Sequence, residues 1–298
     1  MPRSTPTLSV GLAVRNGSAT IGRCIESILS QNCTDVELVV SDNASDDDTV
    51  ETVAGYARAD RRIRLNVNRV NIGLHENMNL ALANATGQYF RWISADDWLE
   101  PGCLSECAHT LARRANAVGV TTGFTIHTAD GSTRYEDYKG EFPTSADPAR
   151  RFERMLWFFH AGDDARYDPI YGVYRRAQLM DTHRLRPRER TDWLLSAELA
   201  LMGPIAHIDD RLANRTRAYP VGVDRAAFRR RLDPVRGEEL RASPAGLCRD
   251  LRGLARSACS TEAQLRQCNR AIRRFWVREV VRTSRLWASD VWHARRVS

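Results

Sequence analysis

Residues 88–97 read QYFRWISADD, an apolar run that ends in two adjacent aspartates. The stretch from Gln88 to Ile93 is rich in aromatic and β-branched side chains and therefore predicts a short buried β-strand. Asp96 and Asp97 follow where this strand would reach the edge of its sheet. Because ligands of open α/β sheets bind beyond the carboxyl ends of the strands, this stretch links a fold class to a candidate site.

Short β-branched runs alternate with amphipathic segments on the N-terminal side of this stretch. Strands are expected at 8–14, 36–41 and 63–67, and helices at Ile21–Leu29, Asp46–Tyr56 and His75–Ala85. This alternation predicts an α/β fold, with a mostly parallel central sheet flanked by helices. A polar cluster at 41–49 follows the second strand, so it should share one crevice with Asp96 and Asp97.

The pattern is less regular on the C-terminal side. Pro101 opens another expected helix, and later elements are a strand at 117–122, a hairpin at 124–135 turning at Asp130-Gly131, a helix at 192–202 and strands at 205–209 and 212–217. The apolar run 151–160 fits either the core or the wall of an acceptor pocket, and the core is favoured because large apolar side chains are mostly buried.

Length and composition indicate one large domain plus an extension. The chain has 298 residues, of which 43% are hydrophobic and 27% charged. We place a main domain at 1–220 and a basic, mostly helical extension at 221–298. Neither a signal peptide nor an apolar run of about 18 residues is visible, so we expect a cytoplasmic protein.

The seven cysteines form no dense framework, so reduced thiols are expected. Cys103, Cys107 and His109 are the tightest cluster. A metal site is one interpretation, but the spacing of four residues between the cysteines favours packing on one helical face.

Asp96 and Asp97 are suited to a hard cation, because Mg²⁺ and Mn²⁺ prefer carboxylate oxygens and complete their shells with phosphates and water. Taken alone, the pair fits a helix N-cap better. The cluster at 41–49 strengthens the functional interpretation. Within it, Asp42 could accept hydrogen bonds from a base or ribose, while residues 45–48 would cap the next helix.

The order and spacing of several motifs resemble glycosyltransferase family 2, a group of inverting enzymes with the Rossmann-like GT-A fold. The motifs are Ala13-Val14-Arg15-Asn16-Gly17, Ser27-Ile28-Leu29-Ser30-Gln31, Asp42-Asn43-Ala44-Ser45-Asp46-Asp47-Asp48-Thr49, Asn71-Ile72-Gly73, and the DXD-like Ser94-Ala95-Asp96-Asp97. The resemblance covers residues 8–217 and implies an α/β fold of the GT-A type with a C-terminal helical extension.

The resemblance also implies roles at the matching positions. The nucleotide of the donor would contact Val14, Arg15, Asp42, Asn71, Gly73 and the ribose-binding Asp96. Asp97 would hold the Mg²⁺ or Mn²⁺ that bridges the diphosphate. The donor would be a UDP-, dTDP- or GDP-sugar, and the acceptor a glycan or a lipid-linked molecule of cell-envelope or surface polysaccharide.

A catalytic base is implied at Asp192, which opens the segment Thr191-Asp192-Trp193-Leu194-Leu195. It would take the proton from the acceptor hydroxyl and give inversion. The alternative is a purely structural residue in a helical turn capped by Thr191.

Two departures from the family pattern bear on the chemistry. Arg15 replaces a tyrosine beside the base, and a guanidinium plane can still stack there. Arg217 stands where relatives often have a metal-binding histidine, and an arginine cannot be a ligand. We expect Arg217 to contact the diphosphate instead, which would weaken the dependence on metal.

The extension carries the positive charge, with 18 arginines and 8 acidic residues from Val223 to Ser298. From Glu262 onward apolar residues recur at helical spacing among these arginines. Such a helix could lie on an anionic membrane surface, pack on the main domain, or pack on a second copy in a homodimer.

Two rival functions remain. A sugar nucleotidyltransferase would need a glycine-rich loop after the first strand, where only Gly17 occurs between residues 13 and 18. A non-catalytic binder of sugars or nucleotides would not need the full set of Asp42, Asp96, Asp97 and Asp192. Nucleic acid is not an expected partner, because acidic clusters in the crevice would repel its phosphates.

Overall fold

The computed structural model describes residues 7–33, 35–136, 141–160, 169–217, 229–230, 233–234, 237 and 243–297. These residues form one nine-stranded sheet with the order β3-β2-β1-β4-β8-β6-β9-β5, and β7 pairs with β6 outside this path. The strands are β1 (Leu8–Val14), β2 (Val36–Asp42), β3 (Ile63–Val67), β4 (Tyr89–Ile93), β5 (Trp98–Leu99), β6 (Gly119–Thr128), β7 (Thr133–Glu136), β8 (Val173–Arg175) and β9 (Ile205–Arg217).

The long strand pairings of the sheet are parallel, as the sequence predicted, whereas the short β5, β7 and β8 pair antiparallel with their neighbours. β1 pairs in parallel with β2 and β4, β2 with β3, and β6 with β9. The short β8 runs antiparallel to both β4 and β6, so β4 and β6 point the same way. The carboxyl ends of β1, β2, β4, β6 and β9 therefore lie on one edge of the sheet.

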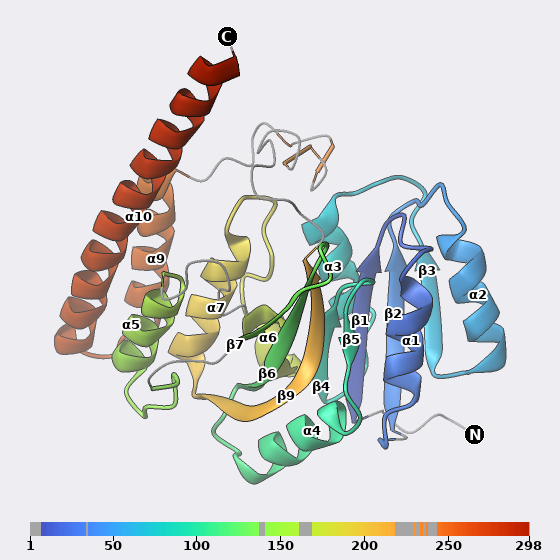
Figure 1. Ribbon diagram of the computed structural model, residues 1–298. Coiled ribbons are helices and arrows are strands. Elements are labelled where there is room, and N and C mark those ends of the chain that lie inside the picture. Colours follow the sequence, from blue (N-terminus) through green and yellow to red (C-terminus); the bar gives the residue numbers. More distant parts are fainter. Residues whose placement is uncertain are drawn as a thin grey trace.

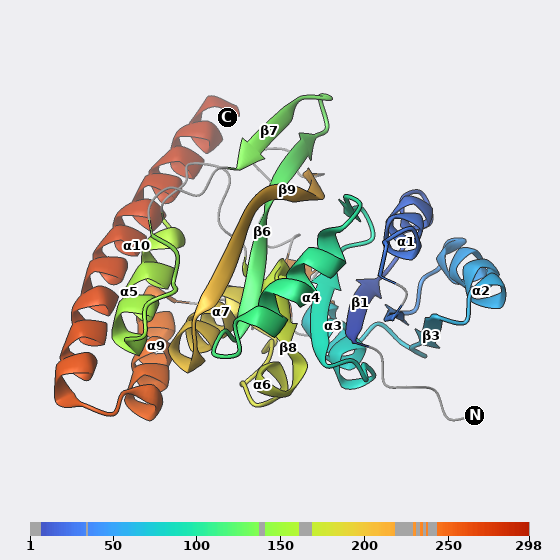
Figure 2. The same ribbon diagram turned by 90° about the horizontal axis from the view of Figure 1, so that it is seen from below.

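Helices lie on both faces of the sheet (Figure 1). The described helices are α1 (Ile21–Leu29), α2 (Thr49–Ala59), α3 (Leu74–Ala83), α4 (Cys103–Arg113), α5 (Pro148–Phe158), α6 (Arg176–Met180), α7 (Thr191–Met202), α9 (Pro244–Ala258) and α10 (Glu262–Val297), with a short 3₁₀ turn at Pro169–Tyr171. Seen from below in Figure 2, α5, α9 and α10 form a group beside α7, at the far side of the molecule from α1 and α2.

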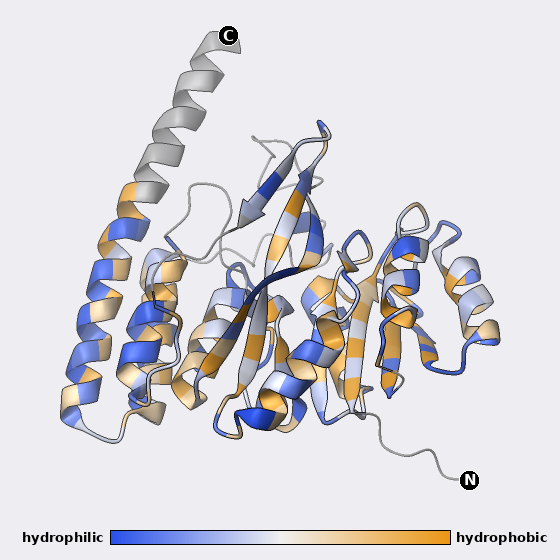
Figure 3. Cartoon of the chain, turned by 60° about the horizontal axis from the view of Figure 1, so that its bottom comes forward, coloured by the Kyte–Doolittle hydropathy of each residue, from blue (hydrophilic) through white to orange (hydrophobic). Residues whose placement is uncertain are grey.

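β4 shows why the sheet is buried on both faces. Successive side chains of a strand point to opposite faces. Phe90 and Trp92 enter the cluster on the side of α3 and α7, whereas Tyr89 and Ile93 enter the cluster on the side of α1 and α4. In Figure 3 the strongest hydrophobic colour falls on such central strands, whereas α10 mixes both ends of the scale.

Two expected strands are joined in β9. Residues 205–217 form a single strand along β6, and its register shifts next to Gly123. A Cβ atom on Gly123 would come within 2.8 Å of the carbonyl oxygen of Asp209, so the close approach requires glycine. The polar residues 209–211, between the two expected strands, mark this irregularity and not a turn.

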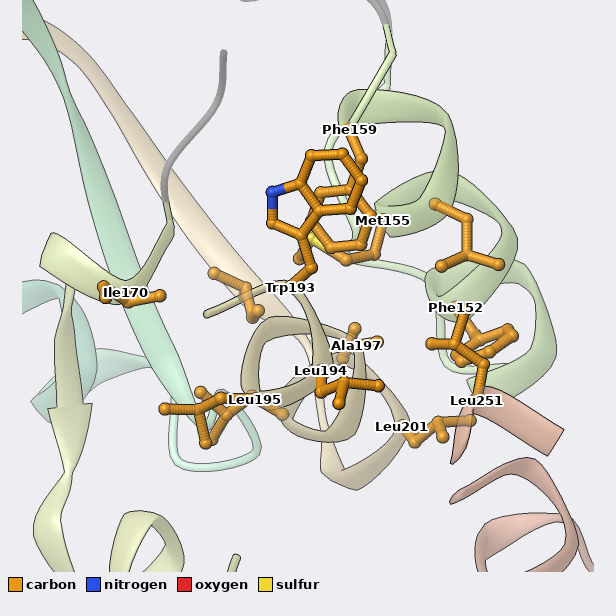
Figure 4. Close-up of a cluster of buried hydrophobic side chains, with 14 of the residues drawn as sticks. Phe152, Met155, Phe159, Ile170, Trp193, Leu194, Leu195, Ala197, Leu201 and Leu251 are labelled. Carbon is orange, nitrogen blue, oxygen red and sulfur yellow. The ribbon is translucent and has the colours of Figure 1, made fainter. Parts of the chain in front are cut away.

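The extension shares a core with the main domain. Buried side chains of α9 and α10 belong to the same cluster as Phe90 and Trp193: Leu247, Cys248, Leu251, Ala255, Cys268, Ala271, Ile272 and Phe275. Figure 4 shows Trp193 of α7 against Phe159 and Met155, with Leu251 of α9 nearby. The apolar run 151–160 is therefore core, as favoured above. The expected boundary near residue 220 lies outside the described residues.

The periodicity of the tail helix is confirmed over its first part, where α10 packs on protein. α9 was not expected from the sequence; it begins at Pro244 and is capped by the side chain of Ser243. Within the described part of the chain, no helix combines the length and hydrophobicity needed to cross a membrane.

Cys103 and Cys107 are buried on α4, as the packing interpretation requires. All seven cysteines are free thiols.

Candidate functional site

A cavity of about 730 Å³ opens at the carboxyl edge of the sheet. It is lined by residues at the end of β1 and in the loops after β1, β2 and β4, namely Ala13, Val14, Arg15, Asn16, Gly17, Ala19, Thr20, Asn43, Ser94, Ala95 and Asp96, together with Asn71, Leu74, Asn77 and Arg230. The two polar clusters thus meet in one crevice, as predicted. Val14, Arg15, Asn71 and Asp96 line it, whereas Asp42, Gly73, Asp97 and Asp192 are not among its lining residues.

Arg15 forms part of the cavity wall because its guanidinium is held by the turn after β2. Nη1 donates to the carbonyl oxygen of Asn43 at 3.1 Å and also to that of Ala44, and Nη2 lies 3.4 Å from Asp46. Asn16, at φ 55°, exchanges two hydrogen bonds with Asp46. The loops after β1 and β2 are therefore connected, so the wall is pre-formed.

Asn43, and not Asp42, presents the polar side chain of this turn to the cavity. Asp42 is completely buried, and its carboxylate accepts hydrogen bonds from the amide and the hydroxyl of Ser45. Asn43 donates to Asn71 Oδ1 at 2.7 Å and accepts from the amide of Ile72 at 2.8 Å. The carboxylate of Asp42 thus shapes the turn, and its expected contact with the base remains a prediction.

Gly73 supports Asn71 through its backbone. Its φ of 86° and ψ of 157° lie in a region that is accessible mainly to glycine, and its amide donates to Asn71 Oδ1 at 2.9 Å. Gly73 thereby orients Asn71 toward Asn43 at the start of α3.

The adjacent aspartates take different positions. Asp96 lines the cavity, and its backbone carbonyl accepts the hydroxyl of Thr216 at 2.7 Å. Asp97 is only 6% exposed; its Oδ1 accepts the amide of Thr216 at 3.0 Å, and its Oδ2 lies 3.7 Å from Nε of Arg215. Burial raises the pKa of Asp97 to about 6, although the charge of Arg215 opposes this shift.

The aspartate pair fits a cation that is shared with a ligand. A buried carboxylate whose pKa is raised lacks sufficient positive charge around it, and a divalent ion would supply that charge. Among the described residues no group of three or more potential ligands occurs. Phosphate oxygens and water would therefore complete the shell, as they commonly do for Mg²⁺.

Arg215 is the described arginine of β9 next to Asp97. Its guanidinium lies 4.2 Å from the ring centroid of Tyr171, and the Tyr171 hydroxyl lies 3.3 Å from that of Ser94. The sequence motifs had pointed to Arg217, whose side chain is outside what the structure describes. Position 215 is related to position 217 by the period of two along a strand, and this signal could have indicated Arg215 as well.

Arg230 was also missed. It lines the cavity although it belongs to the extension. No local signal could have identified it, because it is one of many arginines in a basic region whose path relative to the sheet depends on long-range packing.

Asp192 is the second residue of α7 and is half-buried. α7 leads into β9 through Gly203 and Pro204, and β9 runs parallel to β6. The end of α7 is thus near the amino ends of these strands, and its beginning lies toward their carboxyl ends (Figure 1).

The helix start differs from the capping alternative considered above. Arg190 occupies the cap position at φ 62° and its side chain makes no cap bond. The hydroxyl of Thr191 accepts a hydrogen bond from the amide of Arg186 at 2.6 Å, so this hydroxyl does not cap the helix.

Comparisons with known proteins agree with this architecture. Residues 9–180 match the family model for glycosyl transferase family 2. The putative glycosyltransferase EpsH of Bacillus subtilis (strain 168) is 28% identical over 214 residues, which are 70% of this chain and 54% of EpsH. The chain thus matches only about half the length of that relative.

Two solved structures share the fold. S. aureus TarS 1-349 in complex with UDP-GlcNAc matches with a TM-score of 0.63 and 17% identity, over 88% of this chain and 70% of that chain. The mannosyltransferase PcManGT from Pyrobaculum calidifontis, in complex with GDP-Man and Mn²⁺, matches with a TM-score of 0.54 and 16% identity. The match covers 98% of this chain and 81% of that chain. The expected GT-A fold is confirmed by these similarities.

Proposed function

This chain belongs to glycosyl transferase family 2, and from that membership we propose that it moves a hexose from a nucleotide-diphosphate sugar to an acceptor hydroxyl with inversion. The observation that carries the proposal is the single cavity shared by Arg15, Asn71, Asp96 and Arg230 at the carboxyl edge of the sheet. Its volume of about 730 Å³ is in the usual range of small-molecule sites.

The residues of the cavity suit a nucleotide-sugar donor. Val14, Arg15 and the amides of Asn43 and Asn71 would contact the nucleoside, since a guanidinium plane can stack on a base. Asp96 would accept hydrogen bonds from the ribose. The UDP-GlcNAc bound to TarS supports a UDP-sugar as the first donor to test, and the GDP-Man bound to PcManGT supports a GDP-sugar as the second.

The diphosphate would lie near Asp97, where a divalent cation would neutralise the charge that develops on the departing nucleotide. Asp97, with Asp96 beside it, would hold Mg²⁺ or Mn²⁺, and the Mn²⁺ of PcManGT supports this assignment. Arg230, which lines the cavity, would add positive charge, and we propose the same role for Arg217.

Asp192 would act as the general base. The acceptor hydroxyl attacks the anomeric carbon, its proton passes to the carboxylate of Asp192, and the bond to the diphosphate oxygen breaks on the opposite face of the sugar. Such assistance typically contributes about 10² to 10⁴-fold in rate. The acceptor is a hydroxyl of a glycan or of a lipid-linked molecule in polysaccharide biosynthesis.

The extension would bring the enzyme to an anionic membrane surface when the acceptor is lipid-linked. Trp276, Val277 and Val281 of α10 are 44%, 54% and 46% exposed. Arg273, Arg274 and Arg278 are exposed on the same helix, and arginine with tryptophan suits a bilayer interface. Flotation with vesicles containing phosphatidylglycerol should carry the protein upward, and flotation with neutral phosphatidylcholine vesicles should not.

Nucleotide release provides the test of function. The protein is incubated with a panel of UDP-, dTDP- and GDP-sugars and with Mn²⁺ or Mg²⁺, beside Asp97→Ala and Asp192→Ala. Donor-selective release that is lost in both variants would support the transferase. Nucleotide binding by calorimetry without release from any donor would favour a non-catalytic binder, and pyrophosphate-dependent formation of nucleoside triphosphate would favour a sugar nucleotidyltransferase.

A further inference from the structure

Three consecutive charged residues in the loop before α7 each pair with a residue of opposite charge in the extension. Arg188 pairs with Asp250 of α9, Glu189 with Arg229 at 3.1 Å, and Arg190 with Glu279 of α10 at 2.5 Å. We call these three ion pairs the clamp. The three partners in the extension come from separate parts of it, and all of them contact the tripeptide 188–190.

Two members of the clamp are deeply buried. The side chain of Glu279 is fully buried, and that of Arg229 is 5% exposed. Surface ion pairs contribute little, but a buried charge that loses its partner is strongly unfavourable. The buried pairs therefore restrict the loop to the geometry in which both charges remain matched.

The clamp ends two residues before Asp192. Arg190 occupies the cap position of α7, and its guanidinium lies 5.0 Å from the ring centroid of Trp193. Trp193 is stacked on Phe159 at 4.8 Å, and its ring centroid is 5.9 Å from that of Phe275 in α10. Asp192 therefore lies along the chain between Arg190 and Trp193, both of which contact side chains of α10.

The segment of the extension that contains Arg229 also reaches the cavity. Arg229 binds Glu189, while its neighbour Arg230 lines the cavity. One dipeptide of the extension therefore contacts both the loop before Asp192 and the space for the donor.

We propose that the extension positions the general base through the clamp, so that Glu279, Arg229 and Asp250 are positioning residues for the transfer reaction. This inference rests on the proposed role of Asp192. A misplacement of about 1 Å can cost about 100-fold in rate, so loosening the first turn of α7 should lower kcat more than it weakens donor binding.

Glu279→Gln in the full-length chain is the first test. It removes the charge but keeps the shape, and we expect kcat for nucleotide release to fall about 10 to 100-fold while the donor Kd stays within about twofold. The matched control is Glu153→Gln, which removes another ion pair of α10, that between Glu153 and Arg274 at 2.8 Å. Its side chains are 35% and 70% exposed, and we expect wild-type kcat.

If Glu279→Gln does not fold, a charge exchange between Arg188 and Asp250 provides a second test. Arg188 and Asp250 are 22% and 28% exposed, so substitution there is better tolerated. Asp250→Arg should lower kcat about 3 to 10-fold, and the double variant Arg188→Asp/Asp250→Arg should restore it. If the pair only stabilised the fold, Asp250→Arg would lower the melting temperature, and the double variant would not restore kcat at an unchanged donor Kd.

The outcomes separate this inference from the proposed function. An Asp192→Asn variant with wild-type kcat would overturn the role of the base and the clamp with it. Loss of activity in Asp192→Asn, combined with wild-type kcat in folded Glu279→Gln and Asp250→Arg, would overturn the clamp alone. Loss in all three, with the control unaffected and the double variant restored, is the result we expect.

Discussion

The backbone amide of Thr216 donates to Oδ1 of Asp97 at 3.0 Å, across 119 residues of sequence. The hydroxyl of Thr216 reaches the carbonyl oxygen of Asp96, so β9 is bonded to both members of the acidic pair. Arg215 approaches the other oxygen of Asp97 from the same strand. The orientation of this carboxylate is therefore determined by the last strand of the sheet.

Asp97→Asn should abolish metal-stimulated transfer while the fold is kept. The amide oxygen can still accept from Thr216, but the neutral group cannot balance a divalent cation. We expect nucleotide release to fall at least about 100-fold, as for other lost electrostatic contributions to a transition state. Release measured against Mn²⁺ concentration checks this, with Asp130→Asn at the exposed hairpin tip as the control. Unchanged stimulation by Mn²⁺ in Asp97→Asn would contradict the assignment.

Arg230→Ala should weaken donor binding. Arg230 lines the cavity, where we propose that it contacts the diphosphate, and a charge-assisted hydrogen bond contributes about 1.5–3 kcal/mol. The donor Kd should therefore rise about 10 to 100-fold in calorimetry. Arg273→Ala, on the exposed face of α10, removes one arginine without touching the cavity and should bind like the wild type. Equal affinities for both variants would remove Arg230 from the site.

Asp192→Asn should lower kcat about 10² to 10⁴-fold and leave the donor Kd unchanged, because a general base acts on the acceptor and not on the nucleotide. The control is Glu198→Gln on the same helix, which removes only a contact with the exposed His183. Single-turnover measurements with saturating donor separate the two constants. A raised donor Kd without a fall in kcat would be inconsistent with a base.

Phe275→Ala should destabilise the whole chain, because this ring lies in the cluster that joins the extension to the main domain. Truncating a buried phenylalanine typically costs about 3–5 kcal/mol. Chemical denaturation should show one transition with a lower midpoint. Val277→Ala, at a site 54% exposed, should have little effect. A separate early transition in Phe275→Ala would mean that the extension unfolds as a unit of its own.

Stability should fall as the pH decreases from about 6.5 to about 4, in part because of His207. Burial lowers the pKa of His207 to about 4, although Asp209 opposes the shift. Between these values the unfolded chain binds a proton that the folded chain does not, so the free energy of unfolding decreases by about 2–3 kcal/mol. His207→Asn should flatten this dependence in denaturation curves taken at several pH values. The control is His109→Gln at an exposed position of α4, and an equal slope in all three proteins would refute the contribution of His207.

The order of the strands and helices up to β4 and the parallel pairing of these strands followed from the sequence. Residues 8–14 and 88–97 could be assigned to strands because their apolar runs are a property of short segments. The polar residues at the end of 88–97 could be placed in the crevice because ligands bind beyond the carboxyl ends of the strands in this class of fold. Val14, Arg15, Asn71 and Asp96 accordingly line the cavity as expected.

Other features could not be predicted because they depend on which segments meet in space. Asp42 and Asn43 are adjacent and both polar, and only the bonds to Ser45 and Asn71 decide that Asn43 lines the cavity. The sequence also offered no reason to prefer Arg230 among the arginines of the C-terminal half.

The sequence by itself determined the family, the α/β fold and the acidic pair at the end of β4, since each is recorded in local motifs and their spacing. Only the tertiary structure decided that Thr216 and Arg215 flank Asp97, and that Asp250, Arg229 and Glu279 hold the loop before Asp192. The physical reason is that ion pairs and buried hydrogen bonds act over a few ångströms, whereas their partners here lie between 40 and 119 residues apart along the chain.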